Sequence, residues 1–153
     1  MVSSPIAPPH TYAEWAAVLD LFRDKADDDA VLSAMQQGTL EWQSGVAERF
    51  SKKLVDAFNR RMNAATDKFQ KEMSRAYGQE RAIVQALLSL RREMAFLARA
   101  IDLPVIPEKD RQQYRQLVID QGNSIQNSLE DSAKKDRSGK MSSLVRNNRV
   151  NAF

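Results

Sequence analysis

One hydrophobic pattern constrains the fold of this 153-residue chain more than any other feature. Apolar residues recur at alternating steps of four and three, namely at Ile83, Leu87, Leu90, Met94, Leu97 and Ile101. This alternation is typical of a helix that buries one narrow face against another helix. Neither glycine nor proline interrupts it. The pattern therefore predicts a long packed helix, around which the rest of the chain is organised.

The composition favours helices throughout the chain. Glycine and proline number five each, and aromatic residues make up only 7% of the sequence, a balance that is poor in turns and unlike a strand-rich sandwich. Cysteine is absent, which excludes disulfides and thiolate metal sites, and the single histidine, His10, does not suffice for a zinc centre. We expect an all-α protein without cofactor or metal.

Capping and periodicity signals place five helices. Thr11 followed by Glu14 forms a capping box, Asp27, Asp28 and Asp29 suit the positive end of a short helix better than a calcium loop, and Pro107 suits a first helical turn. The expected helices cover residues 11–26, 29–37, 40–77, 79–103 and 107–135. They predict an elongated antiparallel bundle of four main helices plus one short helix. The expected domains are an extended or disordered lead-in at 1–10, the bundle at 11–137, and a basic and apolar C-terminal segment at 138–153.

Gly78 leaves two architectures open. The apolar face of the third helix stays in register across Gly78 into the fourth, as in one continuous, coiled-coil-like helix from Trp42 to Leu103. Such a rod requires a partner chain to cover its apolar face. A tight turn at Gly78 instead produces a hairpin, and the average helix length favours this alternative.

The net charge of +3 is unevenly distributed along the sequence. Residues 1–45 hold seven acids and two bases, residues 46–103 hold twelve bases and seven acids, and residues 104–153 hold nine bases and six acids. The first part is therefore acidic and the remainder basic, a layout that suits head-to-tail assembly, a bipolar partner or an anionic polymer.

Two basic regions are the candidate nucleic-acid contacts. Helical geometry places one set beside the apolar face of the third helix: Arg60, Arg61, Lys68, Lys71 and Arg75. A solvated face partly neutralised by Asp67 and Glu72 is the simpler interpretation of this set. The second set lies near the C-terminus: Lys134, Lys135, Arg137, Lys140, Arg146 and Arg149.

The C-terminal segment also carries large apolar residues. They are Met141, Leu144, Val145, Val150 and Phe153, interleaved with the bases. A purely electrostatic arm has no use for them, so we expect these five residues to bind another protein chain, in a groove of a partner or on a neighbouring subunit. An unstructured tail is the alternative.

No catalytic motif is recognisable in the sequence. It contains neither a nucleophile and histidine pair nor a glycine-rich phosphate loop. Neither a signal peptide nor a membrane span is expected, because Arg91, Arg92 and Glu93 interrupt the best apolar stretch. The sequence thus favours a cytoplasmic, non-enzymatic adaptor or assembly subunit that binds another protein, itself or a different chain. A nucleic-acid-binding accessory protein is the alternative.

Overall fold

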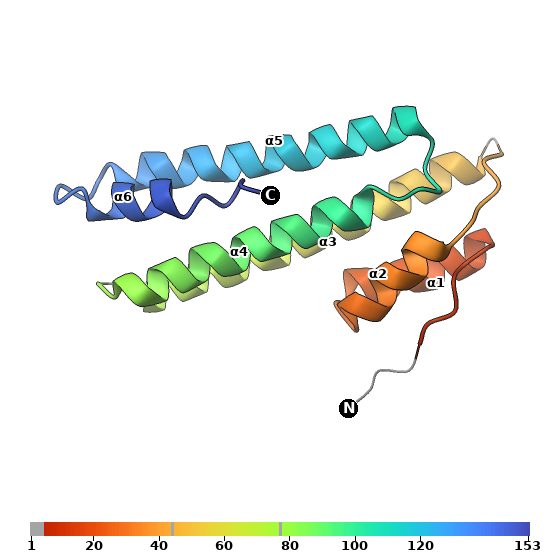
Figure 1. Ribbon diagram of the computed structural model, residues 1–153, viewed down its shortest axis with the longest axis horizontal. Helices are drawn as coiled ribbons and strands as arrows, with labels where there is room; N and C mark the ends of the chain where they lie inside the picture. Colours follow the sequence, from red (N-terminus) through yellow and green to blue (C-terminus); the bar gives the residue numbers. More distant parts are fainter. Residues whose placement is uncertain (1–4, 44, 77) are drawn as a thin grey trace. The chain divides into compact units, whose positions relative to one another are not determined.

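The computed structural model describes residues 5–43, 45–76 and 78–153, and within these ranges the secondary structure consists of six α-helices and no strands. The helices are α1 (Tyr12–Arg23), α2 (Asp28–Gln37), α3 (Val46–Arg75), α4 (Glu80–Ile101), α5 (Glu108–Ala133) and α6 (Lys140–Asn147) (Figure 1). The prediction of an all-α protein is confirmed. No described helix is both long enough and apolar enough to cross a membrane.

The chain forms two compact units that share its long helices. Unit 1 comprises Met1–Asn63 and Arg99–Arg111, and unit 2 comprises Ala64–Ala98 and Gln112–Phe153. The apolar pattern that defines α4 is buried over its whole length, since all six residues from Ile83 to Ile101 are at most 6% exposed. The first five of them belong to unit 2 and Ile101 belongs to unit 1. The predicted boundaries at residues 10 and 137 remain a prediction.

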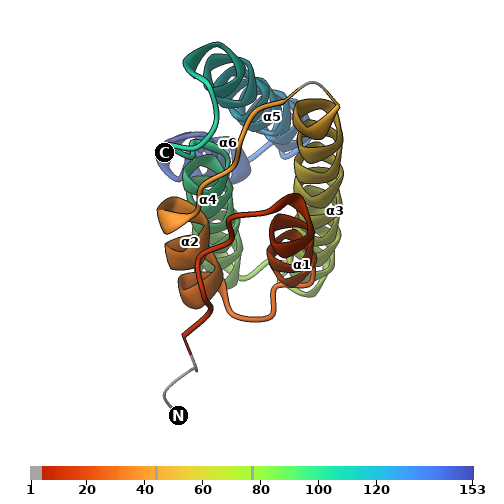
Figure 2. The same cartoon turned by 90° about the vertical axis from the view of Figure 1, so that its right-hand side faces the viewer.

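Unit 1 begins with a pair of capped helices, α1 and α2, which pack side by side (Figures 1 and 2). The Thr11 side chain accepts a hydrogen bond from the Glu14 backbone N–H at 3.2 Å, which is one half of the predicted capping box. The Glu14 carboxylate accepts from the His10 N–H at 3.4 Å, one residue before the predicted donor. Asp27 accepts one from the Ala30 N–H at 3.2 Å, which confirms the capping role predicted for the acidic run. Both helices therefore begin where local side chains satisfy their first backbone donors.

The N-terminus of α3 corrects the sequence prediction. We expected a helix from residue 40, but α3 begins at Val46. Thr39 is held by tertiary hydrogen bonds instead: its N–H donates to the Pro9 carbonyl at 2.9 Å, and its carbonyl accepts from Trp15 Nε1 at 2.8 Å. Trp42 Nε1 donates to the Val105 carbonyl at 2.6 Å. These long-range bonds hold residues 39–43 outside a helix, and no local pattern reveals them.

Aromatic rings fill the core of unit 1. The Phe50 ring lies edge-on to both tryptophans, with centroid distances of 5.2 Å to Trp15 and 5.4 Å to Trp42. Phe22 and Phe58 are also fully buried. The tryptophans thus serve packing, which agrees with their positions on predicted apolar faces.

A buried arginine joins the three helices of unit 1. Arg61 on α3 is 3% exposed, and its two terminal nitrogens lie 2.8 and 3.0 Å from the carboxylate oxygens of Asp28 on α2. It also donates to the Phe22 carbonyl in α1 at 3.2 Å, and its guanidinium lies 4.9 Å from the Phe22 ring centroid. Arg61 therefore neutralises a capping-turn carboxylate from inside the core.

Unit 2 is built on the α3–α4 hairpin. Gly78 has φ of +76°, a left-handed conformation that favours glycine, and it lies between the end of α3 at Arg75 and the start of α4 at Glu80. The hairpin alternative is therefore correct and the continuous helix is wrong. Phe69 of α3 and Ala76, which directly follows α3, pack with Ile83, Leu87 and Leu90 of α4 in the core of this unit.

The sixth helix was not predicted. Residues 138–153 were expected to form a segment without helix, yet Lys140–Asn147 is helical and lies beside α5 (Figures 1 and 2). Met141, Leu144 and Val145 have the spacing of one helical face, but eight residues are too few for this pattern to be distinctive. The helix is stabilised by packing on the core of unit 2, which the sequence does not display.

The Arg61 contacts generate a stability prediction. Replacing Arg61 with alanine leaves the Asp28 carboxylate and the Phe22 carbonyl without this donor, and we expect the free energy of unfolding to fall by roughly 3 kcal/mol. Arg60→Ala is the matched control, because Arg60 is exposed on the same helix, and its cost should stay under about 0.5 kcal/mol. Urea denaturation measures both, and equal midpoints for the two variants would contradict the role assigned to Arg61.

Candidate functional site

The C-terminal segment is fixed to α5 by one buried amide. Gln126 is fully buried; its Oε1 accepts from the Val150 N–H at 3.0 Å, and its Nε2 donates to the Val145 carbonyl at 3.3 Å. The same Nε2 lies 3.1 Å from Glu130 Oε1. Because unpaired backbone groups are costly in a core, this side chain fixes the position of the segment on the helix. We call residues 140–153 the C-terminal latch.

Three further contacts hold the latch along α5. Arg149 Nη1 lies 3.3 Å from Glu130 Oε1, and Asn151 Nδ2 donates to Asn123 Oδ1 at 2.9 Å. The Phe153 ring covers Gly122, where an added Cβ would lie 3.0 Å from the ring. Glycine at 122 therefore permits the close approach of the last aromatic ring to α5.

The five apolar residues predicted to bind a partner occupy different environments. Val145 and Val150 are buried, at 1% and 0% exposure, and Met141 and Leu144 are half-buried against the core of unit 2. Phe153 is 43% exposed. Four of the five thus have packing contacts within their own chain, and Phe153 presents the largest apolar surface to solvent. Partner binding by this set stays a prediction.

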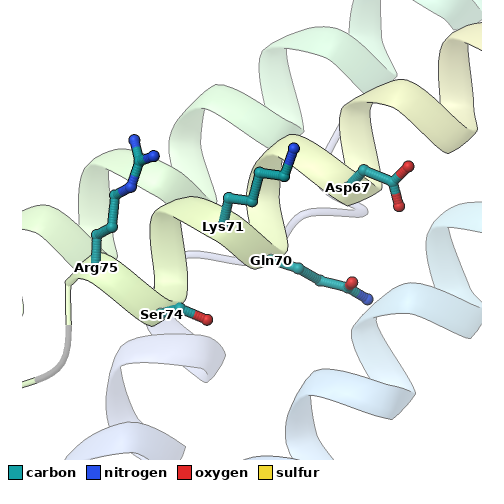
Figure 3. A pocket seen from close by; sticks show the side chains of 5 residues that line it. All are labelled: Asp67, Gln70, Lys71, Ser74 and Arg75. Atoms are coloured by element: carbon teal, nitrogen blue, oxygen red, sulfur yellow. The ribbon is translucent and has the colours of Figure 1, made fainter.

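The predicted basic set on the third helix does not form one exposed stripe. Arg61 is buried, and Arg60 belongs with it to unit 1. Lys68, Lys71 and Arg75 belong to unit 2, where Lys68 Nζ lies 3.6 Å from Glu72 Oε1. Lys71 and Arg75 extend to the same side of α3, as Figure 3 shows, and border a shallow hollow of about 370 Å³. Within the described part of α3 that belongs to unit 2, these two are the exposed cations that form no ion pair.

The C-terminal cations divide into paired and unpaired groups. Lys134 Nζ lies 3.5 Å from Asp131, and Lys140 Nζ lies 3.8 Å from Glu80 Oε1, while Arg149 contacts Glu130. Lys135, Arg137 and Arg146 are exposed and form no ion pair with described residues. Exposed ion pairs contribute little stability, so all six cations keep most of their charge available to an anionic partner.

Two relevant residues escaped sequence reasoning. Ile119 is 40% exposed on α5, and Gln126, seven residues further along the same helix, is fully buried. Ile119 lies outside the apolar face that Tyr114, Leu117 and Val118 form. An isolated apolar residue on the polar side of this helix is the sequence signal that could have identified it. Nothing in the sequence marks Gln126, because its partners are backbone groups 19 and 24 residues away.

Asp136 fixes the start of α6. Its carboxylate accepts from the Met141 N–H at 3.1 Å and from both the N–H and the hydroxyl of Ser138. The hydrogen bond from the Met141 backbone is the largest cause that lowers the pKa of Asp136 below its ordinary 3.8, followed by those from Ser138. Among the described residues, no three His, Cys, Asp or Glu side chains gather to hold a metal ion.

Removal of the Gln126 amide should release the latch selectively. In Gln126→Ala, the Val150 N–H and the Val145 carbonyl lose their partner, at a cost of about 2 kcal/mol. Hydrogen exchange of α6 amides should then be roughly 30-fold faster while α4 amides keep their protection. Asn127→Ala, at an exposed neighbouring position, is the control. Equal loss of protection in α4 and α6 would mean that the latch does not open separately.

The Asp136 cap predicts an acid-sensitive α6. A carboxyl whose pKa is lowered in the folded state stabilises that state above its unfolded pKa, and this contribution disappears as the pH falls through the lower folded pKa. The start of α6 should therefore lose protection as the pH drops below about 3.8. Titration by NMR should show this loss in the wild type, and Asp136→Asn should show weak protection at every pH. A pH-independent wild type would contradict the capping role.

Comparisons with known proteins assign no family to this fold: the chain matches no protein-family model, no curated protein and no solved structure.

Proposed function

We propose that this protein is a non-enzymatic adaptor or assembly subunit that binds another protein chain through an apolar surface on unit 2. The observation that carries the proposal is the pair of exposed apolar side chains on one side of α5, Ile119 at 40% and Phe153 at 43% exposure. We call this pair the α5 patch. The antiparallel bundle expected from the sequence is part of the proposal, as the scaffold that presents it.

The α5 patch is assembled from two distant parts of the sequence. Phe153 covers Gly122, and Ile119 precedes Gly122 by three residues, so the two apolar side chains lie about one helical turn apart on the same side of α5. A single exposed apolar residue is ordinary on a protein surface. An aromatic ring brought beside a second large apolar side chain is the arrangement found at the centres of protein interfaces.

The C-terminal latch reduces the conformational entropy that Phe153 loses when it binds a partner. A side chain beyond the last described helix normally loses conformational freedom when it binds a partner. Here Gln126 holds the Val150 N–H and Asn123 holds the Asn151 side chain, so the chain is already ordered up to two residues before Phe153. The ring is thus preorganised for contact. Buried Val145 and Val150 anchor the segment that carries Phe153, which is the part in binding that we propose for them.

The surroundings of the patch suit a protein interface. Asn123 and Asn151 are polar and uncharged, and Arg149 is paired with Glu130. Arg115 and Asp120 are exposed on α5 near Ile119 in the sequence. An apolar centre with hydrogen-bonding groups at its edge is the usual anatomy of such a surface. The partner that we propose for the α5 patch therefore presents an apolar groove or an apolar helix face.

The test compares two charged substitutions with a matched control. Phe153→Glu and Ile119→Glu place a carboxylate in the α5 patch, and Ser128→Glu places one at an exposed site elsewhere on α5. We expect the two patch variants to lose partner capture from cell extract and any self-association seen by light scattering at least tenfold, since a buried unpaired charge costs several kcal/mol. The control should bind like the wild type.

Circular dichroism should be the same for all three variants, because the substituted side chains are exposed. Identical binding partners and amounts for the wild type and both patch variants would refute the proposal. Catalytic turnover of a small molecule by the purified chain would refute its non-enzymatic part.

A further inference from the structure

Four exposed cations from three segments gather at one end of unit 2. Arg75 ends α3 and Arg81 lies in the first turn of α4, so both flank the α3–α4 turn. Lys135 and Arg137 lie in the connection between α5 and α6. The Lys140 Nζ to Glu80 Oε1 contact of 3.8 Å joins the connection to the start of α4, and Figure 1 shows turn and connection at the same end of this unit. We call these four residues the basic end.

Most acids near the basic end already have other contacts, including Glu72, which lies 3.6 Å from Lys68 Nζ, whereas the exposed Asp67 lines the hollow beside Lys71. Glu80 pairs with Lys140, Asp131 pairs with Lys134, and the Asp136 carboxylate caps α6. Within the described residues, Arg75, Arg81, Lys135 and Arg137 form no ion pair, and all four are exposed. Unit 2 as a whole holds thirteen Lys and Arg against eight Asp and Glu, a net +5, whereas unit 1 holds ten against twelve, a net −2. The excess positive charge of the chain therefore resides in unit 2.

The surface of α3 extends the basic end by one helical turn. Lys71 lies four residues before Arg75, and both side chains point to the same side of the helix (Figure 3). Gln70 and Ser74 line the same shallow hollow and add an amide and a hydroxyl as hydrogen-bond donors. Lysine, arginine, amide and hydroxyl groups are the side chains that contact phosphate oxygens in nucleic-acid complexes.

We propose that the basic end, with Lys71, binds the phosphate backbone of double-stranded nucleic acid without regard to base sequence. Four of the five apolar residues of the C-terminal segment pack within the chain, while Lys135, Arg137 and Arg146 stay exposed. These apolar residues therefore do not count against an electrostatic role for the cations. Phosphate binding is independent of the α5 patch and uses none of its residues.

The chemistry of the surface favours nucleic acid over the other anionic partners. An amphipathic surface that inserts into a membrane carries large apolar side chains beside its cations. The large apolar side chains that are exposed in the described chain are Leu21, Ile119 and Phe153, and Leu21 belongs to unit 1. Ile119 lies fifteen residues before Lys134, roughly 22 Å along α5 and its extension. A protein interface likewise requires an apolar centre, which the basic end lacks among its described residues.

The salt dependence of binding provides the quantitative signature. Each neutralised phosphate contributes about −0.9 to the slope of log affinity against log salt, so roughly four contacts predict a slope near −4. Between about 50 and 200 mM salt, the affinity for a duplex of about 20 base pairs should fall on the order of 100-fold. Fluorescence anisotropy of a labelled duplex, titrated with the full chain, measures this slope.

Two double variants and one matched control test the location. Arg75→Gln/Arg81→Gln and Lys135→Gln/Arg137→Gln each remove two charges from the basic end, and each should weaken binding roughly tenfold and reduce the slope by about 2. Lys52→Gln/Lys109→Gln removes two exposed charges from unit 1 and should keep the wild-type slope. All six side chains are exposed, so circular dichroism should be unchanged.

Three outcomes would overturn the proposal. The first is a wild-type chain that does not bind the duplex at low salt, and the second is an equal loss of affinity in the control and the basic-end variants. The third is binding to vesicles of anionic phospholipid with no binding to the duplex. Phe153→Glu should bind the duplex with at most a small loss from its added negative charge, so a failure of this proposal leaves the proposed protein-binding function separately testable.

Discussion

The continuous burial of one face of α4 is the constraint on which the rest of the structure depends. Its six apolar residues at heptad steps are all buried, and this face contributes to both compact units. Ile83, Leu87 and Leu90 form a core with α3 and with the C-terminal latch. A helix that buries one face along its length in this way requires neighbours along its whole length, and the chain supplies them from residues before and after it.

Each unit adds one buried polar side chain to this apolar framework. Arg61 in unit 1 and Gln126 in unit 2 are the buried polar residues of the described chain. Each joins a long helix to a short peripheral element: Arg61 connects α3 with α1 and α2, and Gln126 connects α5 with the C-terminal latch. Hydrogen bonds of this kind contribute modest net energy but are costly to leave unmade, so they select one arrangement of the peripheral elements. The exposed surfaces follow from that selection, because the latch determines where Phe153 and the C-terminal cations lie.

The separation of apolar and charged groups in unit 2 results from the folding of the C-terminal latch, residues 140–153, back onto α5. In the sequence, apolar and basic residues alternate between Lys140 and Phe153. In the structure, Val145 and Val150 enter the core, whereas Arg146 remains exposed. One alternating segment thereby contributes Phe153 to an apolar surface on α5, and its preceding connection contributes Lys135 and Arg137 to a basic one. The two surfaces can serve two partners because they share no residue.

The sequence by itself determined the all-α fold, the buried face of α4, and the caps at Thr11 and Asp27. It also determined the boundaries of the five predicted helices to within three residues, except at the start of α3. These features depend on periodicity and on contacts between residues a few positions apart, which a sequence displays directly. The tertiary structure alone decided that α3 begins at Val46, that Gly78 forms a turn, that Arg61 is buried, and that the C-terminal segment forms a helix on α5. Apart from the turn, each depends on partners about twenty or more residues away, such as Pro9 for Thr39 and Gln126 for Val150. At Gly78, the register of the apolar face fits a rod and a hairpin equally well, and only the packing of α3 on α4 distinguishes them.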